Sequence, residues 1–391
     1  MLAANAGIAL AWLSSIFPLE LLSGTAMPFD THASDDHILI IGGGMAGSLL
    51  ALVLGRQGLA VTVIDPHRDP PAMFRNEKLG TEQIELLKGL GALACFEAAC
   101  WPEGSYPGGR PSLTDCGAHH QAWLRSVRAA WPDTVSFIES TVESVATSQD
   151  RQTITTSAGE TLTGRLVVLA SGRMHHLHRQ LGIELTTLSA QHSVCLGFSL
   201  ESEHFIPSQV HDLPHGSGIG YVSIFPMPGE TRVNIFSYRA LSDPWTRRMA
   251  KDPLGALAEV SSEAAQALDG ACVLRRCEAR ATDLYATHGH VQDGVVLMGD
   301  AFHAPCPASG TGMLRILHDI TVLTRDHLPA WLETPGMDRD KIAAFYNDPA
   351  KRRLDARSLT SSLRGRGAAV GQGLRWDTWR LLKSVKRALA A

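Results

Sequence analysis

The chain has 391 residues, of which 45% are apolar and 19% are charged, and its formal net charge is −4. This length predicts two or three domains, and this composition excludes an intrinsically disordered protein. The charge is uneven, because residues 351–391 carry eleven Lys and Arg against two Asp, whereas residues 1–350 carry a net charge of −13. A nucleic-acid-binding protein normally concentrates basic residues on its folded domain, so this distribution argues against that class.

Residues 1–36 read as a hydrophobic leader followed by a polar lead-in. Residues 2–27 contain no Lys or Arg, and Glu20 is their only acid. The lack of a basic start argues against a signal peptide, and Pro18 and Gly24 interrupt what would otherwise be long enough to span a membrane. Two interpretations remain, a membrane-contacting leader or an extension upstream of a natural start at Met27, and we favour the second.

A strand, a glycine turn, a helix, a second strand and an acid follow one another between His37 and Asp65. The two strands are apolar runs typical of a buried parallel sheet, at residues 38–41 and 60–64, and the helix lies between them at 48–57. The turn at residues 42–47 reads G-x-G-x-x-G in the context that this motif requires. This stretch predicts a dinucleotide-binding unit.

Each position of the turn has a physical reason. Gly42 permits the tight turn, Gly44 lets the backbone approach a pyrophosphate, and Gly47 lets helix and strand pack closely. The helix N-terminus then offers free N–H groups and a positive dipole end to phosphates. Asp65 closes the second strand at the spacing expected of an acid that binds a ribose hydroxyl, which favours FAD or NAD over NADP.

Further strands and helices follow up to residue 183. Arg75 lies after a proline-rich loop and is expected near whatever the glycine turn holds. The patterns predict helices at residues 84–90 and 121–130, a strand pair at 135–145 and 152–162, and a buried strand at 165–170 that returns to the first sheet.

The pattern changes to alternating strands between residues 184 and 286. Apolar and polar residues alternate at 194–200, 218–226 and 231–239, as in an antiparallel sheet with one buried face. Residues 225–230 read as a turn, residues 252–268 as a helix, and residues 273–284 as a return to the first domain.

A second stretch with chemical character runs from Gly294 to Gly312. A buried strand delivers Asp300 at its carboxyl end, where open α/β sheets bind ligands. A Pro- and Gly-rich loop follows, and then a helix predicted at residues 313–327. Gly310 and Gly312 leave bare backbone at the N-terminus of that helix, which is a second potential anion site.

Seven cysteines with no C-x-x-C pair favour reduced thiols over a disulfide framework or a zinc site. Histidines cluster at His119-His120 and at His175-His176-x-His178, but no nearby acid or cysteine completes a metal set. We therefore predict no metal site.

With these motifs in view, the chain resembles the FAD-dependent aromatic hydroxylases, or group A flavoprotein monooxygenases. The resemblance covers residues 38–325 and rests on the glycine turn with Asp65 and on Gly299-Asp300-Ala301-Phe302-His303 followed by Pro307, Gly310, Gly312 and Asp319. It implies an α/β protein with a Rossmann-like FAD-binding domain (residues 37–183 and 287–350), an inserted antiparallel-sheet substrate domain (184–286), and a basic helical C-terminal tail (351–391).

The resemblance also implies a cofactor site and a reaction. The FAD-binding residues would be Gly42, Gly44, Met45, Ala46, Gly47, Asp65, Arg75, Gly299, Asp300, Pro307, Gly310, Thr311, Gly312 and Met313. The family's reduced flavin traps O₂ as a C4a-hydroperoxide, so this chain would hydroxylate or epoxidise an aromatic or prenylated lipophilic molecule. The candidate catalytic residues are His303, Tyr221 and Arg239.

One motif departs from the family. The middle motif, A-D-G-x-x-S-x-x-R, reads Ala170-Ser171-Gly172 and ends in His175 and His178 where the family has Ser and Arg. NADH or NADPH is the expected electron donor, but this change also allows a separate flavin reductase. Cys306 beside the flavin loop is a further unusual residue, more simply explained as a small buried side chain than as a redox group.

Several rival interpretations remain. A flavin-dependent reductase or dehydrogenase of a prenyl lipid would suit Cys306 and the altered motif. A halogenase lacks support because the motif W-x-W-x-I-P is absent, and a non-catalytic flavin partner or sensor is the least favoured.

Residues 374–391 alternate apolar and basic side chains, which predicts either a helix on anionic lipid or one packed on the protein. We expect a cytoplasmic protein, either free or bound peripherally to the inner membrane face.

Overall fold

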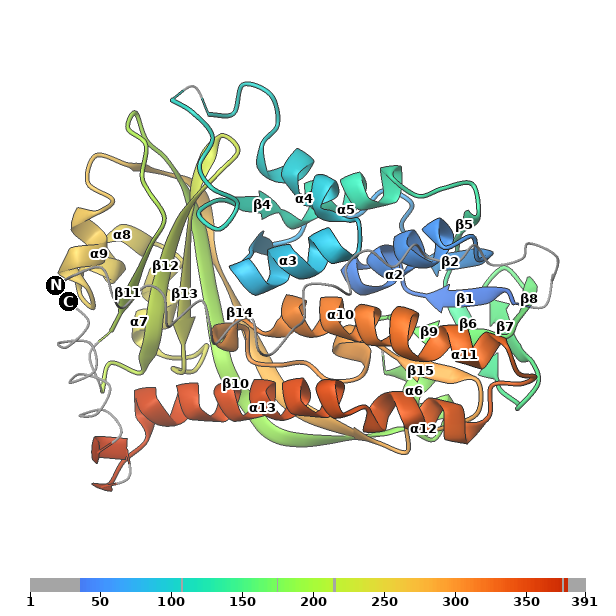
Figure 1. Cartoon of the computed structure of the whole chain (residues 1–391). Coiled ribbons are helices and arrows are strands. Elements are labelled where there is room, and N and C mark those ends of the chain that lie inside the picture. Colours follow the sequence, from blue (N-terminus) through green and yellow to red (C-terminus); the bar gives the residue numbers. More distant parts are fainter. Residues whose placement is uncertain (1–35, 107, 174, 214–215, 375, 379–391) are drawn as a thin grey trace, which may run out of the picture.

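The structure, a computed structural model, describes residues 36–106, 108–173, 175–213, 216–374 and 376–378. The hydrophobic leader and most of the basic stretch at residues 374–391 lie outside these residues. A five-stranded parallel sheet has the order β15-β9-β1-β2-β5, with bounds β1 Ile38–Ile41, β2 Val61–Asp65, β5 Val135–Glu139, β9 Leu166–Leu169 and β15 Val295–Leu297. Figure 1 places this sheet at the centre of one half of the molecule.

Both faces of the parallel sheet are covered, which explains why its strands are continuously apolar. On one face pack α2 (Met45–Arg56), α3 (Thr81–Gly89), α4 (Leu93–Cys100), α5 (His120–Ala129) and α10 (Gly312–Thr321). On the other face lie α6 (His176–Gln180) and a three-stranded sheet of β6 (Val142–Ala146), β7 (Gln152–Thr156) and β8 (Thr161–Gly164). The fold class predicted from the sequence is confirmed.

The predicted strand pair at 135–145 and 152–162 was partly wrong. Residues 135–139 form β5 and join β2 in the parallel sheet, whereas residues 142–146 form β6 and pair with β7. Strand β5 ends before Ser140. The N–H of Ser140 donates to the carbonyl of Asp65, which is the last hydrogen bond between this segment and β2. An apolar run therefore contributed to two sheets.

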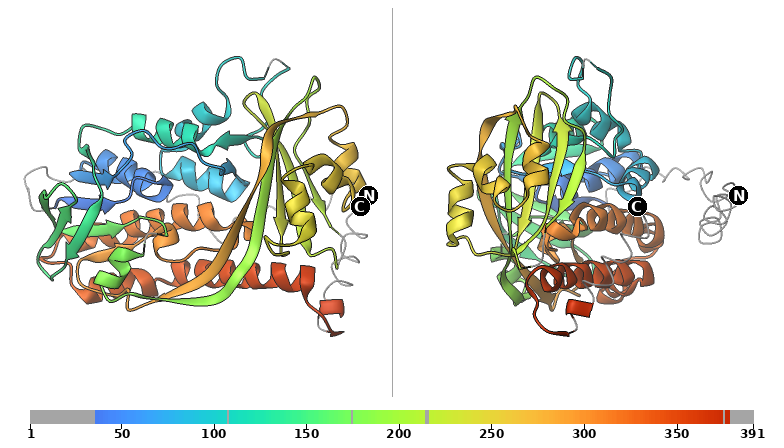
Figure 2. Two further views of the ribbon diagram at one scale, coloured as in Figure 1. Left: turned by 180° about the vertical axis from the view of Figure 1, so that it is seen from behind. Right: turned by 90° about the vertical axis from the view of Figure 1, so that its left-hand side faces the viewer.

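The second sheet is antiparallel and has the order β11-β12-β13-β10-β14. Its strands are β10 Glu184–Glu201, β11 Gln209–Asp212, β12 Ile219–Met227, β13 Glu230–Ser237 and β14 Cys272–His288. The long, curved ribbon of β10 and β14 connects this sheet to the first half of the molecule (Figures 1 and 2). Because β14 extends across the predicted boundary between residues 286 and 287, the predicted domain boundaries stay a prediction.

Three short helices cover one face of the antiparallel sheet: α7 (Pro244–Met249), α8 (Pro253–Ala258) and α9 (Ser262–Gln266). The predicted single helix at 252–268 was wrong, because two caps divide it. Asp252 accepts a hydrogen bond from the N–H of Gly255, and Ser261 accepts one from that of Ala264, so each begins a helix of its own. The predicted turn at 225–230 shrinks to two residues between β12 and β13.

The C-terminal part also differs from the expectation of one helix at 313–327. After α10 the chain continues as a π-helical segment, η4 (Val322–His327), then α11 (Leu328–Leu332), α12 (Arg339–Asn347) and α13 (Pro349–Val370). Thr321 and Thr324 donate their hydroxyls to the carbonyls four residues earlier, a bond that perturbs regular helices. None of the described helices has both the length and the apolarity that a membrane span requires.

Candidate active site

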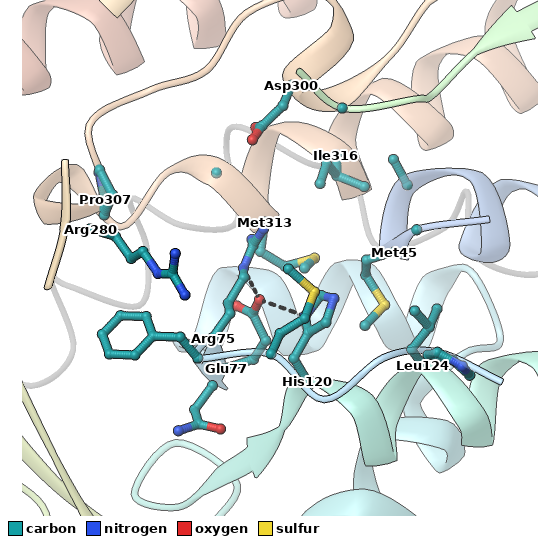
Figure 3. A pocket seen from close by; sticks show the side chains of 18 of the residues that line it. Met45, Arg75, Glu77, His120, Leu124, Arg280, Asp300, Pro307, Met313 and Ile316 are labelled. Atoms are coloured by element: carbon teal, nitrogen blue, oxygen red, sulfur yellow. Dashed lines mark hydrogen bonds and ion pairs between the residues drawn. The ribbon is translucent and has the colours of Figure 1, made fainter. Parts of the chain in front are cut away.

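One cavity of about 1540 Å³ lies between the two sheets and is lined by both. We call the part formed by the glycine turn, α2, α10 and the loop at residues 299–312 the nucleotide wall. We call the part formed by β10, β12, β13 and β14 the substrate wall. Figure 3 shows where the side chains of the two walls meet, with Met45, Asp300 and Met313 on one side and Arg280 on the other.

The glycine turn of the nucleotide wall has the geometry that its sequence predicted. Gly42 has a φ of +107°, and a Cβ there would lie 2.6 Å from the carbonyl oxygen of Ala170. A Cβ on Gly47 would lie 2.0 Å from the carbonyl oxygen of Gly42, so helix and strand meet there without room for a side chain. A Cβ on Gly44 would meet nothing within 4 Å, so this position faces open space in the cavity.

Two helix N-termini face the cavity without a side-chain cap. Helix α2 begins after Gly44 and α10 after Thr311, and neither residue satisfies the free N–H groups of the first turn. Neither first turn contains an acid. Both ends therefore offer unpaired donors and positive dipole ends to an anionic ligand.

Asp65 and Arg128 hold the glycine turn through hydrogen bonds with its backbone. Asp65 accepts hydrogen bonds from the N–H groups of Gly43 and His67, at 2.8 and 2.9 Å. Arg128, on α5, donates to the carbonyl of Gly43 at 2.5 Å. The sequence identified Asp65 but missed Arg128, because a surface-like arginine on a helix carries no local signal for a contact 85 residues away.

An ionic group, in which Glu77 and His120 are buried and Arg75 is partly exposed, lies in the cavity lining (Figure 3). Glu77 accepts from Arg75 Nε and lies 3.2 Å from His120 Nδ1. Burial alone would raise the pKa of Glu77, but Arg75 and His120 outweigh it and the pKa is lowered. Glu77, and more weakly Asp300, raise the pKa of Arg75. Arg75 lines the cavity, and its role in binding the cofactor stays a prediction. Glu77 and His120 were missed because β3 (Asn76–Lys78) and β4 (Gly117–His119) bring them together.

The loop at residues 299–312 joins the two walls. Asp300 lies in a short 3₁₀ turn, 3.8 Å from Arg173, and its carbonyl accepts a hydrogen bond from Tyr285. Eleven of the predicted cofactor residues line the cavity: Gly42, Gly44, Met45, Ala46, Asp65, Arg75, Asp300, Pro307, Gly310, Gly312 and Met313. Gly47, Gly299 and Thr311 do not, since Gly47 packs behind the turn and Thr311 bonds Ser309 and Ser358.

The three candidate catalytic residues are not brought together. Tyr221 lines the cavity, donates to the carbonyl of Ala308, and has a pKa raised by burial. His303 lies outside the lining; burial lowers its pKa to about 4 and its Nε2 has no hydrogen-bond partner among the described atoms. Arg239 also lies outside, donates to the carbonyl of Ser217 and faces Trp245. Their catalytic roles stay predictions.

The altered middle motif has structural contacts of its own. Ser171 lines the cavity, and its buried hydroxyl has no partner among the described atoms. His178 is buried and its Nε2 lies 2.7 Å from the carbonyl of Ala301, which ties the motif to the loop at 299–312. Cys306 is buried, its pKa is raised by that burial, and its thiol donates to Ser193.

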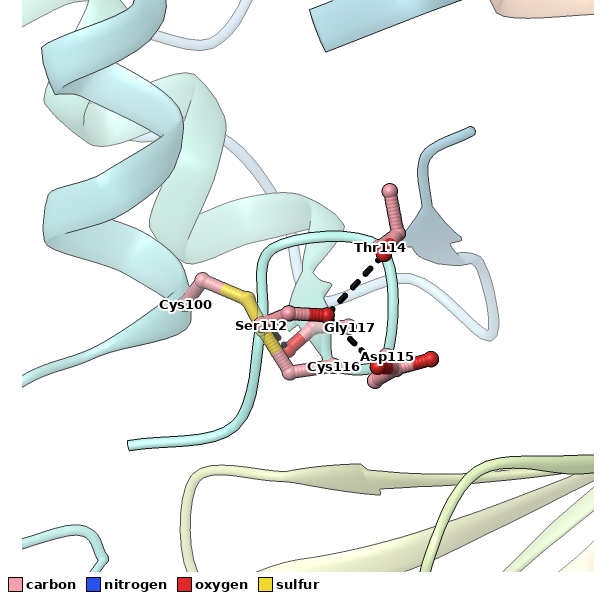
Figure 4. The surroundings of a disulfide bond; sticks show 6 residues. All are labelled: Cys100, Ser112, Thr114, Asp115, Cys116 and Gly117. Atoms are coloured by element: carbon pink, nitrogen blue, oxygen red, sulfur yellow. Dashed lines mark hydrogen bonds between the residues drawn. A yellow bond between two sulfur atoms is a disulfide. The ribbon is translucent and has the colours of Figure 1, made fainter. Parts of the chain in front are cut away.

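A disulfide joins Cys100, at the end of α4, to Cys116, just before β4 (Figure 4). The prediction of reduced thiols was therefore wrong for these two residues. The loop between the two cysteines folds back so that β4 pairs with β3. The spacing of the cysteines in the sequence does not indicate that this pairing brings them together. Five cysteines among the described residues remain free: Cys95, Cys195, Cys272, Cys277 and Cys306.

The residues of the nucleotide wall fit an adenine dinucleotide that carries a flavin. The open space at Gly44 and two uncapped helix ends suit phosphates, and Asp65 closes the strand beside them. The cavity then continues past Asp300 and Pro307 to a second, side-chain-rich wall. A site of this kind defines an FAD-dependent oxidoreductase.

Comparisons with known proteins agree with this class. Residues 37–211 match the model of the lycopene cyclase protein family. The chain is 26% identical over 343 residues to the ubiquinone hydroxylase UbiL of Rhodospirillum rubrum, covering 81% of this chain and 78% of that protein. It is 28% identical over 339 residues to a kynurenine 3-monooxygenase of Salinispora arenicola, covering 74% and 71%.

A solved structure shares the fold. PqsL of Pseudomonas aeruginosa, described as a probable FAD-dependent monooxygenase, superimposes with a TM-score of 0.63 at 20% identity, covering 85% of this chain and 97% of that one. The resemblance to flavoprotein monooxygenases is thus confirmed. The chain is an FAD-dependent oxidoreductase that is similar to named hydroxylases and monooxygenases.

Proposed function

We propose that this enzyme inserts one oxygen atom of O₂ into an aromatic ring, with electrons from NADH or NADPH. The observation that carries this proposal is the continuity of the cavity, in which nucleotide-binding backbone and an aromatic, polar substrate wall share one space. The bound flavin would supply the oxygen chemistry. The chain would hold its phosphates at the ends of α2 and α10 and exclude water from the ring site.

Individual residues support particular roles in this proposal. Arg75, fixed by Glu77 and His120, would face the anionic part of the cofactor. Asp300 would bind the polar chain between nucleotide and flavin ring. Tyr221, held 3.1 Å from the carbonyl of Ala308, would contact the substrate beside the loop as a neutral phenol, because its pKa is raised.

The altered middle motif bears on the choice of electron donor. Ser171 and His178 replace family residues, and His178 is engaged with Ala301. A separate flavin reductase is the alternative source of electrons. The peripheral membrane contact proposed for residues 374–391 is independent of both, and deleting those residues should abolish binding to anionic liposomes if it is correct.

The test is anaerobic stopped-flow absorbance of the protein loaded with FAD. NADH or NADPH should bleach the oxidised flavin band, and added O₂ should restore it, with oxygenated product from an aromatic substrate detected by mass spectrometry. If FAD binds but neither nucleotide bleaches it, the electrons come from a partner reductase. Failure to bind FAD would overturn the proposed function.

A further inference from the structure

The turn that follows β15 presents one carboxylate to the cavity and several backbone carbonyls to buried side chains. We call residues 299–303 the Asp300 turn. The Asp300 side chain lines the cavity and is 34% exposed. Three carbonyls of the turn each accept a hydrogen bond from a side chain of a different element. A buried carbonyl outside regular secondary structure needs such a donor, so these bonds decide how the turn lies.

Three buried side chains supply the donors. They are Tyr285 on β14, bonded to the carbonyl of Asp300, His178 on α6, bonded to that of Ala301, and Arg315 on α10, bonded to that of His303. The last two of these bonds are both 2.7 Å long. None of the three donor residues is more than 6% exposed, so water competes little for the bonds. We call Tyr285, His178 and Arg315 the clamp.

Each clamp residue has a second contact that fixes its direction. The ring of His175 lies 5.7 Å from that of His178 and 6.0 Å from that of Tyr285, measured between centroids. Arg315 Nε donates to Asp355 of α13 at 2.8 Å. Both histidines by which the middle motif departs from the flavoprotein pattern therefore lie in the clamp or against it.

The backbone of the turn does not fix these carbonyls by itself. The N–H groups of Phe302 and His303 both bond to a single carbonyl, that of Gly299, at 3.1 Å. Those two bonds close the turn, but they leave the carbonyls that the clamp holds without a donor from the turn. The orientation of the Asp300 turn thus depends on side chains from three other elements.

A carboxylate binds a ligand hydroxyl well only within narrow limits of distance and angle, so the orientation of the turn decides how well Asp300 can bind. We propose that the clamp positions the Asp300 carboxylate for the cofactor, so that the altered middle motif acts on the cofactor site through the backbone of this turn. Among the described residues that line the cavity, none belongs to the clamp, so its members are positioning residues. This proposal rests on the proposed function, in which Asp300 binds the polar chain of FAD.

The test is a double-mutant cycle on the affinity of the full chain for FAD, measured by flavin fluorescence. Y285F and H178L each remove one donor and should weaken FAD binding about threefold to tenfold, the range of one hydrogen bond. In a D300A background each change should alter the affinity by less than about twofold, because the carboxylate that the clamp orients is gone. H178Q keeps an N–H at about the reach of the imidazole Nε2 and should restore most of the affinity.

H37L is the matched control. His37 Nε2 bonds the hydroxyl of Thr62 at 2.8 Å just before β1, whereas the cavity adjoins the other end of that strand. H37L should therefore lower the stability of the protein without changing its affinity for FAD. Arg315 is left unchanged in the test, because its loss would leave the carboxylate of Asp355 with one cation fewer.

Every outcome decides the proposal. Unchanged FAD affinity in Y285F and H178L overturns it, and so do losses that persist in D300A or that H37L reproduces. If H178L does not fold, Y285F and its D300A cycle still decide, because that change removes only a hydroxyl. Wild-type affinity in D300A would overturn both the clamp and the role of Asp300. Absent FAD binding by the wild type would instead overturn the proposed function as a whole.

Discussion

The two walls of the cavity recognise their ligands in different ways. The nucleotide wall presents main-chain groups, at a glycine turn and at two uncapped helix ends. The substrate wall presents side chains, which project from alternate positions of four strands. Backbone recognition suits a constant ligand such as a pyrophosphate, whereas side-chain recognition can change with each substrate while the fold is kept.

Each wall also contains or adjoins a buried cation, and the two cations are compensated differently. Lys351, behind the nucleotide wall, is 0% exposed and lies 2.9 Å from Asp319 and 3.2 Å from Asp355. Arg232, in the substrate wall, has no such partner among the described residues. We interpret the first as part of the scaffold and the second as part of a binding site, and the predictions below test that contrast.

The largest effect is expected at Lys351. In K351M, Asp319 loses its cation while remaining buried, and uncompensated buried charges typically cost ~3–5 kcal/mol. Urea denaturation should show this loss in the free energy of unfolding. R352M, a change at the exposed neighbour on the same helix, should have little effect. A K351M protein as stable as wild type would contradict the scaffold role.

The disulfide should stabilise the protein next to the substrate wall, where Phe225 lies. Gly117, beside Cys116, packs under Phe225, since a Cβ there would lie 2.4 Å from that ring. Closing a loop of this length stabilises by about 3 kcal/mol, so C100S/C116S should unfold at correspondingly lower urea concentration. Alkylation of the denatured, unreduced protein should label five of seven cysteines. Seven labels would show that the bond is absent.

Two glycines of one turn should separate folding from cofactor binding. G47A places a methyl 2.0 Å from a backbone oxygen and should cost about 1–3 kcal/mol of stability without any ligand. G44A meets nothing within 4 Å and should leave the ligand-free protein intact while weakening FAD binding, because the phosphates need that space. Thermal unfolding with and without FAD measures both. An unchanged FAD affinity in G44A would argue against phosphates at this position.

The contrast between the walls explains what the sequence could predict. The glycine turn, Asp65 and Asp300 could be singled out as cavity residues because the motifs that contain them lie within a few consecutive residues. Glu77, His120 and Arg232 were missed because each acquires its partner from a distant strand or loop. The long helix at 313–327 was mispredicted since periodicity does not reveal threonines that bond back to the helix backbone.

The burial of His303 should make the stability of the protein depend on pH. Burial lowers its pKa to about 4, so the folded protein keeps it neutral where the unfolded chain protonates it. Above the unfolded pKa of about 6.5, neutral His303 costs the folded state nothing. As the pH falls from there towards 4, the unfolded chain takes up the proton that the folded protein refuses, and the free energy of unfolding decreases by at most ~1.4 kcal/mol per pH unit. H303F should show a flatter decline in that range by denaturant titration. Parallel curves for the two proteins would contradict this.

The smallest effect is expected for R232M in the ligand-free protein. The arginine forms hydrogen bonds with Asn234 and Phe74, but its buried charge lacks a carboxylate, so an apolar chain of similar length should change the free energy of unfolding by less than about 1 kcal/mol. A loss as large as that of K351M would mean that Arg232 is another scaffold cation.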